Sequence, residues 1–400
     1  MYRALKYFVV VLLLFGSFLL IGEVLGDPGG VEQLLFACVF LTASLFFLSS
    51  YLACWLILTH DEMHAHITHD HLPGVQKVHG KSVPRIGGVA LLFALLVGMP
   101  VLSHTFPRAH FGSLIGLLTL CSLPVFLGGF MEDLFANVSV KTRLTLSFIS
   151  SGLLVLVAGI VVPTFNLPWL DQVVTGLPFA LELFTVFAVA GVSHSFNLID
   201  GFNGLASGLS LVVNSAVMYV AFAVGDHTVV MLSLLLNAGT LGFLVWNWPK
   251  GKIFLGDGGA YLLGFLTAGV LVLLVQRNPV VSSWLPLVLV GFPVFETLYS
   301  IYRRKRHTRK SPGAPDDLHI HQLVFRQVVK HRPKGYCKWL SSNSLTTLPI
   351  LLAVGLVSTL AAHYYQDTTA QITICLVGVI LYIGLYRYLA SSCRGAIEST

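Results

Sequence analysis

The sequence predicts an all-α, polytopic membrane protein with about 11 to 12 transmembrane helices. Three observations lead to this fold class: 10% of the residues are charged, 55% are hydrophobic, and the mean hydropathy is +0.81. Because soluble domains are usually about 25% charged, an ordinary soluble enzyme is excluded. Apolar runs of roughly 20 residues can cross a bilayer as helices, and their unbroken hydrophobicity favours helices over the alternating strands of a barrel.

Twelve apolar runs are the candidate membrane spans. They cover residues 7–25, 33–58, 86–104, 111–129, 144–163, 177–197, 205–225, 229–247, 258–275, 283–301, 345–365 and 370–390. The first run is too long for a cleaved signal peptide and lacks a small-residue cleavage site, so we expect it to remain as an anchor. The six cysteines are scattered without a C-x-x-C pair, and they predict neither a metal centre nor a disulfide framework.

The distribution of basic residues predicts the orientation of the chain. With both termini in the cytoplasm, all of the 24 lysines and arginines except Arg108 and Arg277 fall on the cytoplasmic side. This bias follows the positive-inside rule. The net charge of +6 is therefore attributed to membrane topology and not to nucleic-acid binding.

The same topology places five polar motifs on the cytoplasmic face. They follow the second, fourth, sixth, eighth and tenth predicted spans and read KVHGKSVPRIGG, GGFMEDLFANVSVKTR, SFNLIDGFNG, NWPKGKIFLGDGG and DDLHIHQ. Carboxylates are costly to bury near lipid, and those found there usually bind an ion, a proton or a substrate. We therefore expect one reaction centre where a soluble cytoplasmic substrate meets a lipid. A transporter would more often place polar groups near the bilayer midplane.

The acidic candidates are Glu132 and Asp133 at the end of the fourth span and Asp257 before the ninth. Adjacent carboxylates repel each other unless a cation or a shared proton relieves them, although a solvated helix cap is the simpler interpretation of this pair. Asp257 is flanked by glycines and could offer oxygen to Mg²⁺, and the N-terminus of the helix that begins there favours phosphate. An Asp N-cap is the alternative.

Polar side chains of two further motifs are also candidates for binding a ligand. Asn197, Asp200 and Asn203 are three residues apart, so in a helix they would share a face suited to a nucleobase or a sugar. Helix capping is again the alternative. His319 and His321 are two apart and do not share a helix face, which favours a turn or an extended segment. They could contact phosphate oxygens or ligate a metal.

Four further side chains complete the set of candidates. Lys77 and His79 supply positive charge before the third span, where a phosphate would be favoured, and Asn247 is a polar group upstream of Asp257. Glu296 lies inside the tenth span and is predicted to pair with a base or to brace the bundle. The basic run 303–306 is interpreted as a stop-transfer anchor near anionic headgroups.

In their order and spacing, these motifs resemble the polyprenyl-phosphate N-acetylhexosamine-1-phosphate transferase family over residues 70–330. The matching pieces are Lys77-Val-His79 with 84–88, Glu132-Asp133 with 138–143, 196–201, 253–258 and 319–321. The His-Ile-His form is similar to the undecaprenyl-phosphate N-acetylglucosamine-1-phosphate transferase branch. The branch of cell-wall translocases, which act on UDP-MurNAc-pentapeptide, carries a longer histidine run.

The resemblance implies transfer of a sugar-1-phosphate, expected to be an N-acetylhexosamine-1-phosphate, from a UDP-sugar to undecaprenyl phosphate with release of UMP. It implies Mg²⁺, or alternatively Mn²⁺, held by Asp257 and Asp133. Glu132 and Asp133 would orient or deprotonate the lipid phosphate. The implied substrate contacts are Asn197, Asp200 and Asn203 for the uridine or sugar, His319 and His321 for the diphosphate, and Lys77, His79 and Asn247 at a second rank.

The corresponding organisation is membrane-anchor helices over 1–60, a catalytic core over 61–344 and C-terminal helices over 345–400. The implied location is a bacterial inner membrane, and the implied pathway is an envelope glycan such as the O-antigen of lipopolysaccharide. A homodimer is left open. The competing hypotheses are a translocase-type transferase, a multi-pass or proton-coupled transporter and a catalytically silent scaffold.

The chain departs from the family pattern at four positions. Glu132 stands where an aspartate is usual, Asn203 where an acid is usual, and Gln322 where a further histidine is frequent. The expected Arg-Lys pair is reduced to Gln76 and Lys77. These differences predict an altered sugar preference or a reduced activity.

Overall fold

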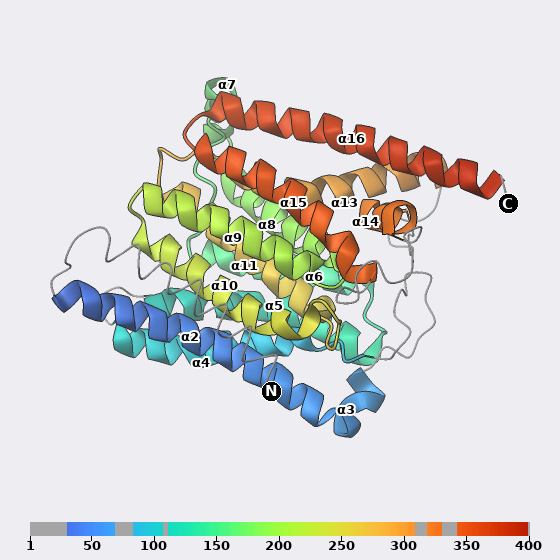
Figure 1. The fold of residues 1–400 in the computed structure, drawn as a ribbon. Coiled ribbons are helices and arrows are strands. Elements are labelled where there is room, and N and C mark those ends of the chain that lie inside the picture. Colours follow the sequence, from blue (N-terminus) through green and yellow to red (C-terminus); the bar gives the residue numbers. More distant parts are fainter. Residues whose placement is uncertain (1–29, 69–82, 107–110, 309–317, 330–341, 399–400) are drawn as a thin grey trace.

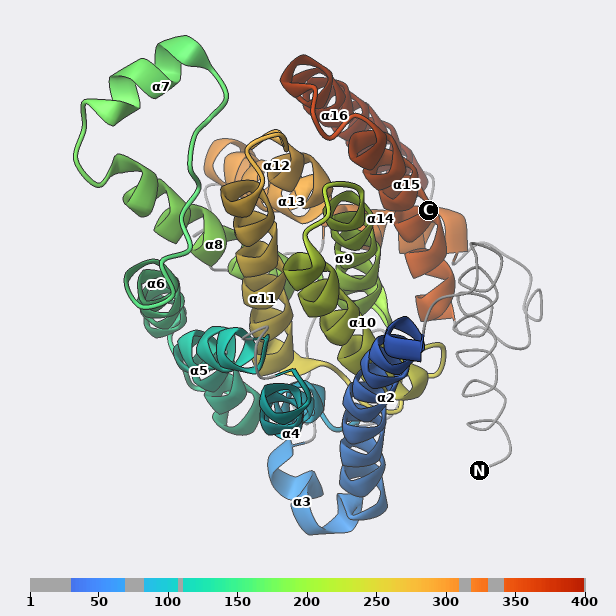
Figure 2. The same ribbon diagram turned by 90° about the vertical axis from the view of Figure 1, so that its left-hand side faces the viewer.

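The fold is a bundle of helices, seen from the side in Figure 1 and from one end in Figure 2. The structure is a computed structural model that describes residues 30–68, 83–106, 111–308, 318–329 and 342–398. The helices are α2 (Gly30–Thr59), α3 (Asp61–Thr68), α4 (Gly87–Thr105), α5 (Phe111–Phe135), α6 (Val140–Leu156), α7 (Pro168–Thr175), α8 (Ala180–Ile199), α9 (Leu205–Ala223), α10 (His227–Asn247), α11 (Gly256–Arg277), α12 (Leu285–Leu289), α13 (Gly291–Arg303), α14 (Ile320–Val324), α15 (Ser342–His363) and α16 (Thr368–Glu398). Two π-helical turns, η1 (Arg304–Thr308) and η2 (Phe325–Val329), extend α13 and α14.

Within the described residues, nine helices are long and apolar enough to cross a membrane, which confirms the predicted all-α, polytopic membrane fold but not the number of 11 to 12 spans. They are α2, α4, α5, α8, α9, α10, α11, α15 and α16. The predicted first span, 7–25, lies outside the described residues. The bounds predicted for the fifth span, 144–163, were wrong, because α6 starts at Val140 and ends at Leu156.

The predicted tenth span, 283–301, is not one continuous helix. It consists of α12 and α13, which meet at Val290. Pro293 explains the interruption, because proline lacks an N–H and its ring clashes with the carbonyl four residues earlier, that of Leu289. Glu296 lies on α13, after the break, and contacts Tyr382 of α16.

α11 is the central helix of the bundle. The 18-residue apolar window of this helix is completely buried, whereas the corresponding window of α16 is only 17% buried. In Figure 2, α11 lies among α5, α8, α9 and α12. A helix that is apolar on all sides is stable in this position because it has protein contacts in every direction. The start of α11 is therefore held by several neighbours, while α16 presents a broad apolar surface to its surroundings.

The described parts of the polar motifs meet at one end of the bundle, which we call the site end. Backbone hydrogen bonds join the segment before α4 to the segment before α11, from Gly87 N to the Phe254 carbonyl and from Phe254 N to the Pro84 carbonyl. At the opposite end, Arg277 donates to Asp226 at 2.7 Å. Arg277 is one of the two basic residues that the sequence places on the non-cytoplasmic side, and this ion pair gives it an acidic partner there.

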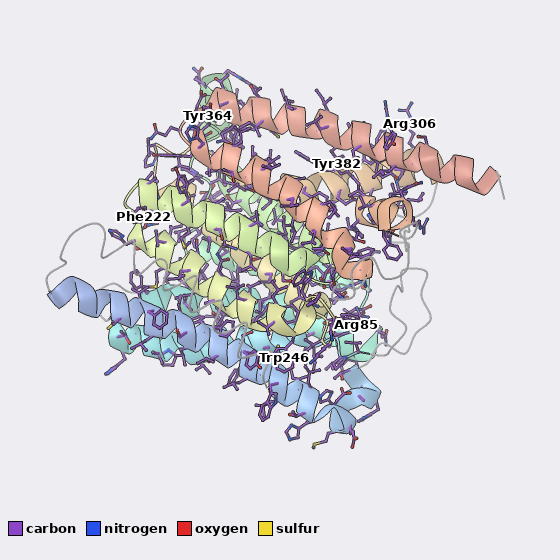
Figure 3. All side chains as sticks on the ribbon, in the orientation of Figure 1. Arg85, Phe222, Trp246, Arg306, Tyr364 and Tyr382 are labelled. Carbon is purple, nitrogen blue, oxygen red and sulfur yellow. The ribbon has the colours of Figure 1, made fainter. Side chains whose placement is uncertain are left out.

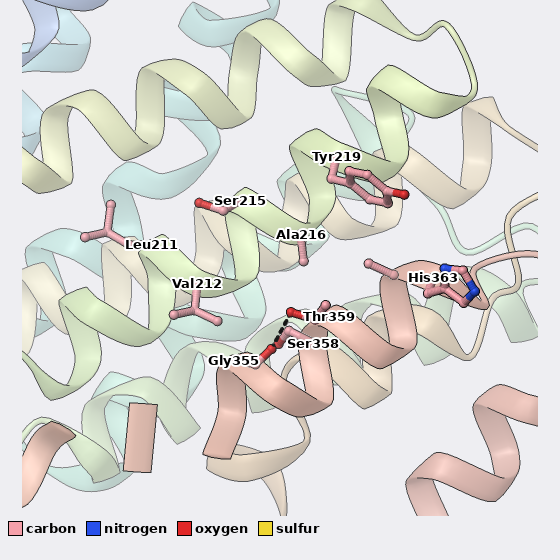
Figure 4. A pocket seen from close by; sticks show the side chains of 10 residues that line it. Leu211, Val212, Ser215, Ala216, Tyr219, Gly355, Ser358, Thr359 and His363 are labelled. Atoms are coloured by element: carbon pink, nitrogen blue, oxygen red, sulfur yellow. Dashed lines mark hydrogen bonds between the residues drawn. The ribbon is translucent and has the colours of Figure 1, made fainter. Parts of the chain in front are cut away.

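A groove of about 570 Å³ lies between the C-terminal halves of α9 and α15, away from the site end (Figure 4). Its lining is largely apolar, with Tyr219 on α9 and His363 on α15 among its residues. The lining includes none of the side chains that the sequence nominated for chemistry.

Candidate active site

The start of α11 touches the backbones of two neighbouring helices. A Cβ atom on Gly129 of α5 would lie 2.5 Å from the Gly258 nitrogen, and one on Gly88 of α4 would lie 2.4 Å from the Gly259 nitrogen. Side chains at Gly88 or Gly129 would therefore collide with the backbone of α11. This close approach explains the glycines on both sides of the contact, since only glycine leaves the space that it requires.

Asp133, on the last turns of α5, caps α11 from outside the helix. Its Oδ1 accepts a hydrogen bond from Asp257 N at 2.8 Å and its Oδ2 accepts one from Gly258 N at 2.9 Å. The side chain is only 1% exposed. The first N–H groups of a helix lack partners inside it and attract negative charge. Asp133 therefore already supplies an anion at this N-terminus, where the sequence favours phosphate.

Two arginines surround the neighbouring carboxylate of Asp257. Arg143 Nη1 lies 2.6 Å from Asp257 Oδ2, and Arg85 Nη2 lies 3.4 Å from Asp257 Oδ1 and 3.6 Å from Asp133 Oδ1. Figure 3 shows Arg85 at the site end of the bundle. Two acids and two bases from four separate segments thus form one acid–arginine centre, which we define as Arg85, Asp133, Arg143 and Asp257.

Sequence reasoning had counted Arg85 and Arg143 as topology-determining charges and did not select them as site residues. The available signal was that both belong to matching motifs, 84–88 and 138–143. Glu132 has a different partner: its Oε2 accepts a hydrogen bond from Val138 N at 2.7 Å. This contact closes the turn between α5 and α6 and agrees with the capping interpretation of Glu132.

Asp200 lies beyond the end of α8, in the turn that leads to α9. Burial and the nearby negative charge of Asp257 raise the pKa of Asp200 to about 7, although Arg85 acts in the opposite direction. Asp200 therefore belongs electrostatically to the acid–arginine centre. Because α8 ends at Ile199, Asn197, Asp200 and Asn203 do not share one helix face, and that prediction was wrong. Asn197 remains on the last turn of α8, with a half-buried side chain.

The amides of Asn203 and Asn247 connect loops at the site end. Asn247 Oδ1 accepts from Gly204 N at 2.6 Å, and its Nδ2 donates to the Ile253 carbonyl at 2.8 Å. Asn203 is buried, and its Nδ2 donates to the Pro249 carbonyl at 3.3 Å. These contacts fix the segment before α11, so both residues have a structural task. Their predicted contact with substrate stays a prediction.

His319 and His321 lie against the turn between α8 and α9. The imidazole rings of the two residues stack with centroids 5.4 Å apart, and a Cβ atom on Gly201 would lie 3.3 Å from His321 Nε2. His319 has extended backbone angles, which agrees with the expected extended segment. His321 lies in the first turn of α14. His319 Nδ1 lies 2.8 Å from Glu296 Oε1, which confirms that Glu296 pairs with a base.

The remaining candidates, Lys77 and His79, lie outside the described residues.

Gln322, which stands where a further histidine is frequent, contacts the histidine segment: its side-chain oxygen accepts a hydrogen bond from His319 N at 3.2 Å. The Gln322 side chain thereby caps the start of α14. This departure from the pattern therefore preserves the local geometry of the histidine pair.

Asp257 and Asp133 differ in how well they fit a metal ion. Among the described residues, no three His, Cys, Asp or Glu side chains converge in a preformed metal site. Mg²⁺ is usually held by one or two carboxylates together with substrate phosphates. Asp257 fits this mode, because its side chain is 17% exposed and contacts arginine side chains, which can move. Asp133 fits it poorly, since its two oxygens cap α11.

The helical membrane bundle and its one-ended acid–arginine centre define a polytopic membrane enzyme of the kind that handles anionic substrates. The sequence profile of glycosyl transferase family 4 matches residues 115–275. This segment contains Asp133, Arg143, Asp200 and Asp257. Over this segment, the chain is similar to this family.

Proteins of three bacteria illustrate the similarity. The chain is 27% identical to the probable undecaprenyl-phosphate N-acetylglucosaminyl 1-phosphate transferase of Bacillus subtilis (strain 168), over 77% of this chain and 80% of the relative. It is 28% identical to the undecaprenyl-phosphate alpha-N-acetylglucosaminyl 1-phosphate transferase of Thermotoga maritima, over 64% and 73%. The protein of the same name from Escherichia coli (strain K12) is 28% identical, over 70% and 75%.

Proposed function

We propose that the protein transfers N-acetylhexosamine-1-phosphate from a UDP-sugar to undecaprenyl phosphate. The observation that carries the proposal is the acid–arginine centre at the start of α11, within the family segment. In the reaction, an oxygen of the lipid phosphate forms a bond to the β-phosphorus of the UDP-sugar. The bond from this phosphorus to the bridging oxygen breaks, and the oxygen leaves with UMP. The names of the similar proteins support N-acetylglucosamine as the sugar.

Charge neutralisation is the central requirement of this reaction, because both reactants are anionic phosphates. Arg85 and Arg143 can exchange their contacts with Asp257 for phosphate oxygens, since guanidinium groups bind both anions in the same geometry. Asp133 keeps the start of α11, and thereby Asp257, in position. When bound at Asp257, Mg²⁺ would neutralise diphosphate charge and favour the departure of UMP.

The other side chains have substrate-binding roles in this proposal. Asp200, in the turn after α8, and Asn197, on the last turn of α8, would contact the uridine or the sugar. His319 and His321 approach the same turn and would contact the diphosphate. Glu132 would act on the position of the lipid phosphate through the loop that it closes.

We place the site end on the cytoplasmic side of a bacterial inner membrane. The support is the excess of lysine and arginine in the sequence of the connections that we expect to be cytoplasmic. The chain termini would then also be cytoplasmic. An envelope glycan such as O-antigen is the proposed destination of the lipid-linked sugar, with Mg²⁺ or Mn²⁺ as the cofactor. A homodimer is compatible with the broad exposed surface of α16.

A labelled-sugar assay tests the proposed function. Membranes containing the protein are incubated with undecaprenyl phosphate, Mg²⁺ and UDP-N-acetylglucosamine labelled in the sugar, and the lipid fraction is extracted. Label should enter the lipid with wild-type protein and not with Asp257→Asn. Glu182→Gln, in the first turn of α8 far from the site end, is the matched control and should keep wild-type activity. Uptake of the sugar nucleotide into vesicles without labelled lipid would instead establish a transporter.

A further inference from the structure

The C-terminal helix α16 forms a small apolar core with the segment that carries the two histidines. This core is separate from the main core of the bundle and consists of Ile320, Leu323, Val324, Tyr382, Tyr386 and Leu389. α16 lies beyond the segment that matches the family profile, residues 115–275. The histidine segment is thus packed against a helix to which the sequence assigned no role in the site.

α14 depends on such neighbours for its position. It has only five residues, and helices of this length are unstable alone because nucleation costs more than one turn of hydrogen bonds returns. The position of the histidine pair must therefore come from contacts with other elements. The side chains that hydrogen-bond to this segment include Glu296 of α13 and Tyr386 of α16.

Tyr382 and Tyr386 provide two hydroxyl contacts from one face of α16. They are four residues apart and therefore lie above one another on the helix. The Tyr386 hydroxyl donates to the Leu318 carbonyl at 3.0 Å, and the Tyr382 hydroxyl donates to Glu296 Oε2 at 2.8 Å. The first contact holds the residue before His319 directly. The second holds His319 through Glu296. Figure 3 shows Tyr382 between α16 and the elements below it.

Glu296 joins these contacts because it binds three groups at once. Its Oε1 lies 2.8 Å from His319 Nδ1, its Oε2 accepts from Tyr382, and the Ile320 N–H donates to the carboxylate at 3.2 Å. The side chains of Glu296 and His319 are 1% and 2% exposed. A buried carboxylate is stable only when its oxygens are satisfied, and here Tyr382 supplies one of the donors. A carboxylate on Nδ1 also orients the ring and leaves Nε2 for other partners.

From these contacts we propose that α16, through Tyr382 and Tyr386, is the positioning element of the histidine pair. The proposal rests on the proposed transferase function for its catalytic consequence. His321 lies beside Gly201, next to Asp200, and the rings of Phe202 and His321 meet edge to face with centroids 5.3 Å apart. Through its contacts with the histidine segment, α16 therefore holds this segment against the turn that borders the acid–arginine centre. Tyr382 and Tyr386 are positioning residues, because they act through Glu296 and the backbone of the histidine segment.

Tyr382→Phe tests this proposal, because it removes one hydroxyl and keeps the ring in the apolar core. Tyr388→Phe is the matched control, since Tyr388 is on the same helix and 69% exposed. Purified protein in lipid nanodiscs is measured in three ways: amide hydrogen exchange of residues 318–324 without substrate, the melting temperature, and kcat and KM for the UDP-sugar.

In Tyr382→Phe, the hydrogen-exchange rate of the 318–324 amides should rise roughly tenfold and kcat should fall roughly tenfold. Changes of this size are expected for the loss of a hydrogen bond to a charged group. KM for the UDP-sugar and the melting temperature should stay close to those of Tyr388→Phe. The double variant Tyr382→Phe with Tyr386→Phe should increase both effects further.

Unchanged exchange in the double variant would overturn the positioning role. So would a kcat equal to that of Tyr388→Phe, or a fall in kcat explained fully by a loss of folded protein. If the wild-type protein transfers no label at all, the proposed function fails. The exchange comparison is independent of turnover and would still decide whether α16 holds the histidine segment.

Discussion

The acid–arginine centre and the histidine segment face the same turn, but they are held in different ways. At the acid–arginine centre, glycines bring the backbones of α4, α5 and α11 into contact, and Asp133 caps α11 through two backbone hydrogen bonds. The histidine segment is held by side chains from α13 and α16. Backbone contacts leave no freedom, whereas side-chain contacts can be lost one at a time. Substitutions should therefore have all-or-none effects at the centre and graded effects at the histidine segment.

The largest effect should come from Gly129→Ala. Its methyl group would lie 2.5 Å from the Gly258 nitrogen, and neither backbone can move without separating α5 from α11. We expect little folded protein and no detectable transfer, as measured by detergent-solubilised yield and lipid labelling. Gly152→Ala is the control, because a Cβ atom there meets nothing within 4 Å. Normal folding and activity in Gly129→Ala would show that the centre is less rigid than the contact geometry requires.

Asp257→Asn should lower kcat by at least about 100-fold, the scale on which removal of one electrostatic group affects catalysis. The amide keeps the shape but loses the charge that binds Arg85 and Arg143. The yield of folded protein should be close to that of wild type, and the dependence of the remaining turnover on Mg²⁺ should weaken. Titration of activity with Mg²⁺ measures this change. Wild-type turnover in the variant would remove Asp257 from the mechanism.

The pKa of Asp200 makes the stability of the folded protein depend on pH. Its pKa in the folded protein, about 7, is above the usual 3.8, so the neutral form is favoured by folding. The stabilisation from this group is complete below pH 3.8 and is lost as the pH rises through 7. The melting temperature of wild type should therefore fall relative to Asp200→Asn between about pH 4 and 7 and level off at higher pH. A difference between the two proteins that stays constant over this range would contradict the raised pKa.

The smallest effect should come from Glu132→Asp. The shorter side chain reaches Val138 N less well and loosens the turn after α5, which costs about 1 kcal/mol. Transfer should stay within about threefold of wild type, measured together with the melting temperature. Complete loss of transfer would instead show that the longer side chain is an adaptation of the acid–arginine centre.

The sequence was sufficient to predict the helical membrane fold and the meeting of Asp133 with Asp257. Hydrophobic run length determines the first, and the placement of polar motifs on alternate connections determines the second. It did not identify Arg85 and Arg143, because their partner Asp257 is 172 and 114 residues away and a basic residue at a membrane boundary is already explained by topology. Tyr382 was missed for a similar reason: an aromatic residue in an apolar run has no visible partner until the fold places Glu296 beside it.

The sequence also could not distinguish amides that bind ligands from amides that hold loops. Asn203 and Asn247 lie in glycine-rich segments that suit both uses, and only the fold shows Asn247 joining Gly204 to Ile253. The break between α12 and α13 was available in advance from Pro293, but the hydrophobicity of the run concealed it.

The cap that Asp133 provides has a consequence for the order of assembly. The most deeply enclosed helix, α11, starts on a carboxylate from a helix made more than a hundred residues earlier, so the nascent chain must retain α5 until α11 emerges. Replacing Asp133 with alanine would leave two buried amides without an acceptor. Variants recovered as inactive at this position should therefore also appear among those cleared by cellular quality control.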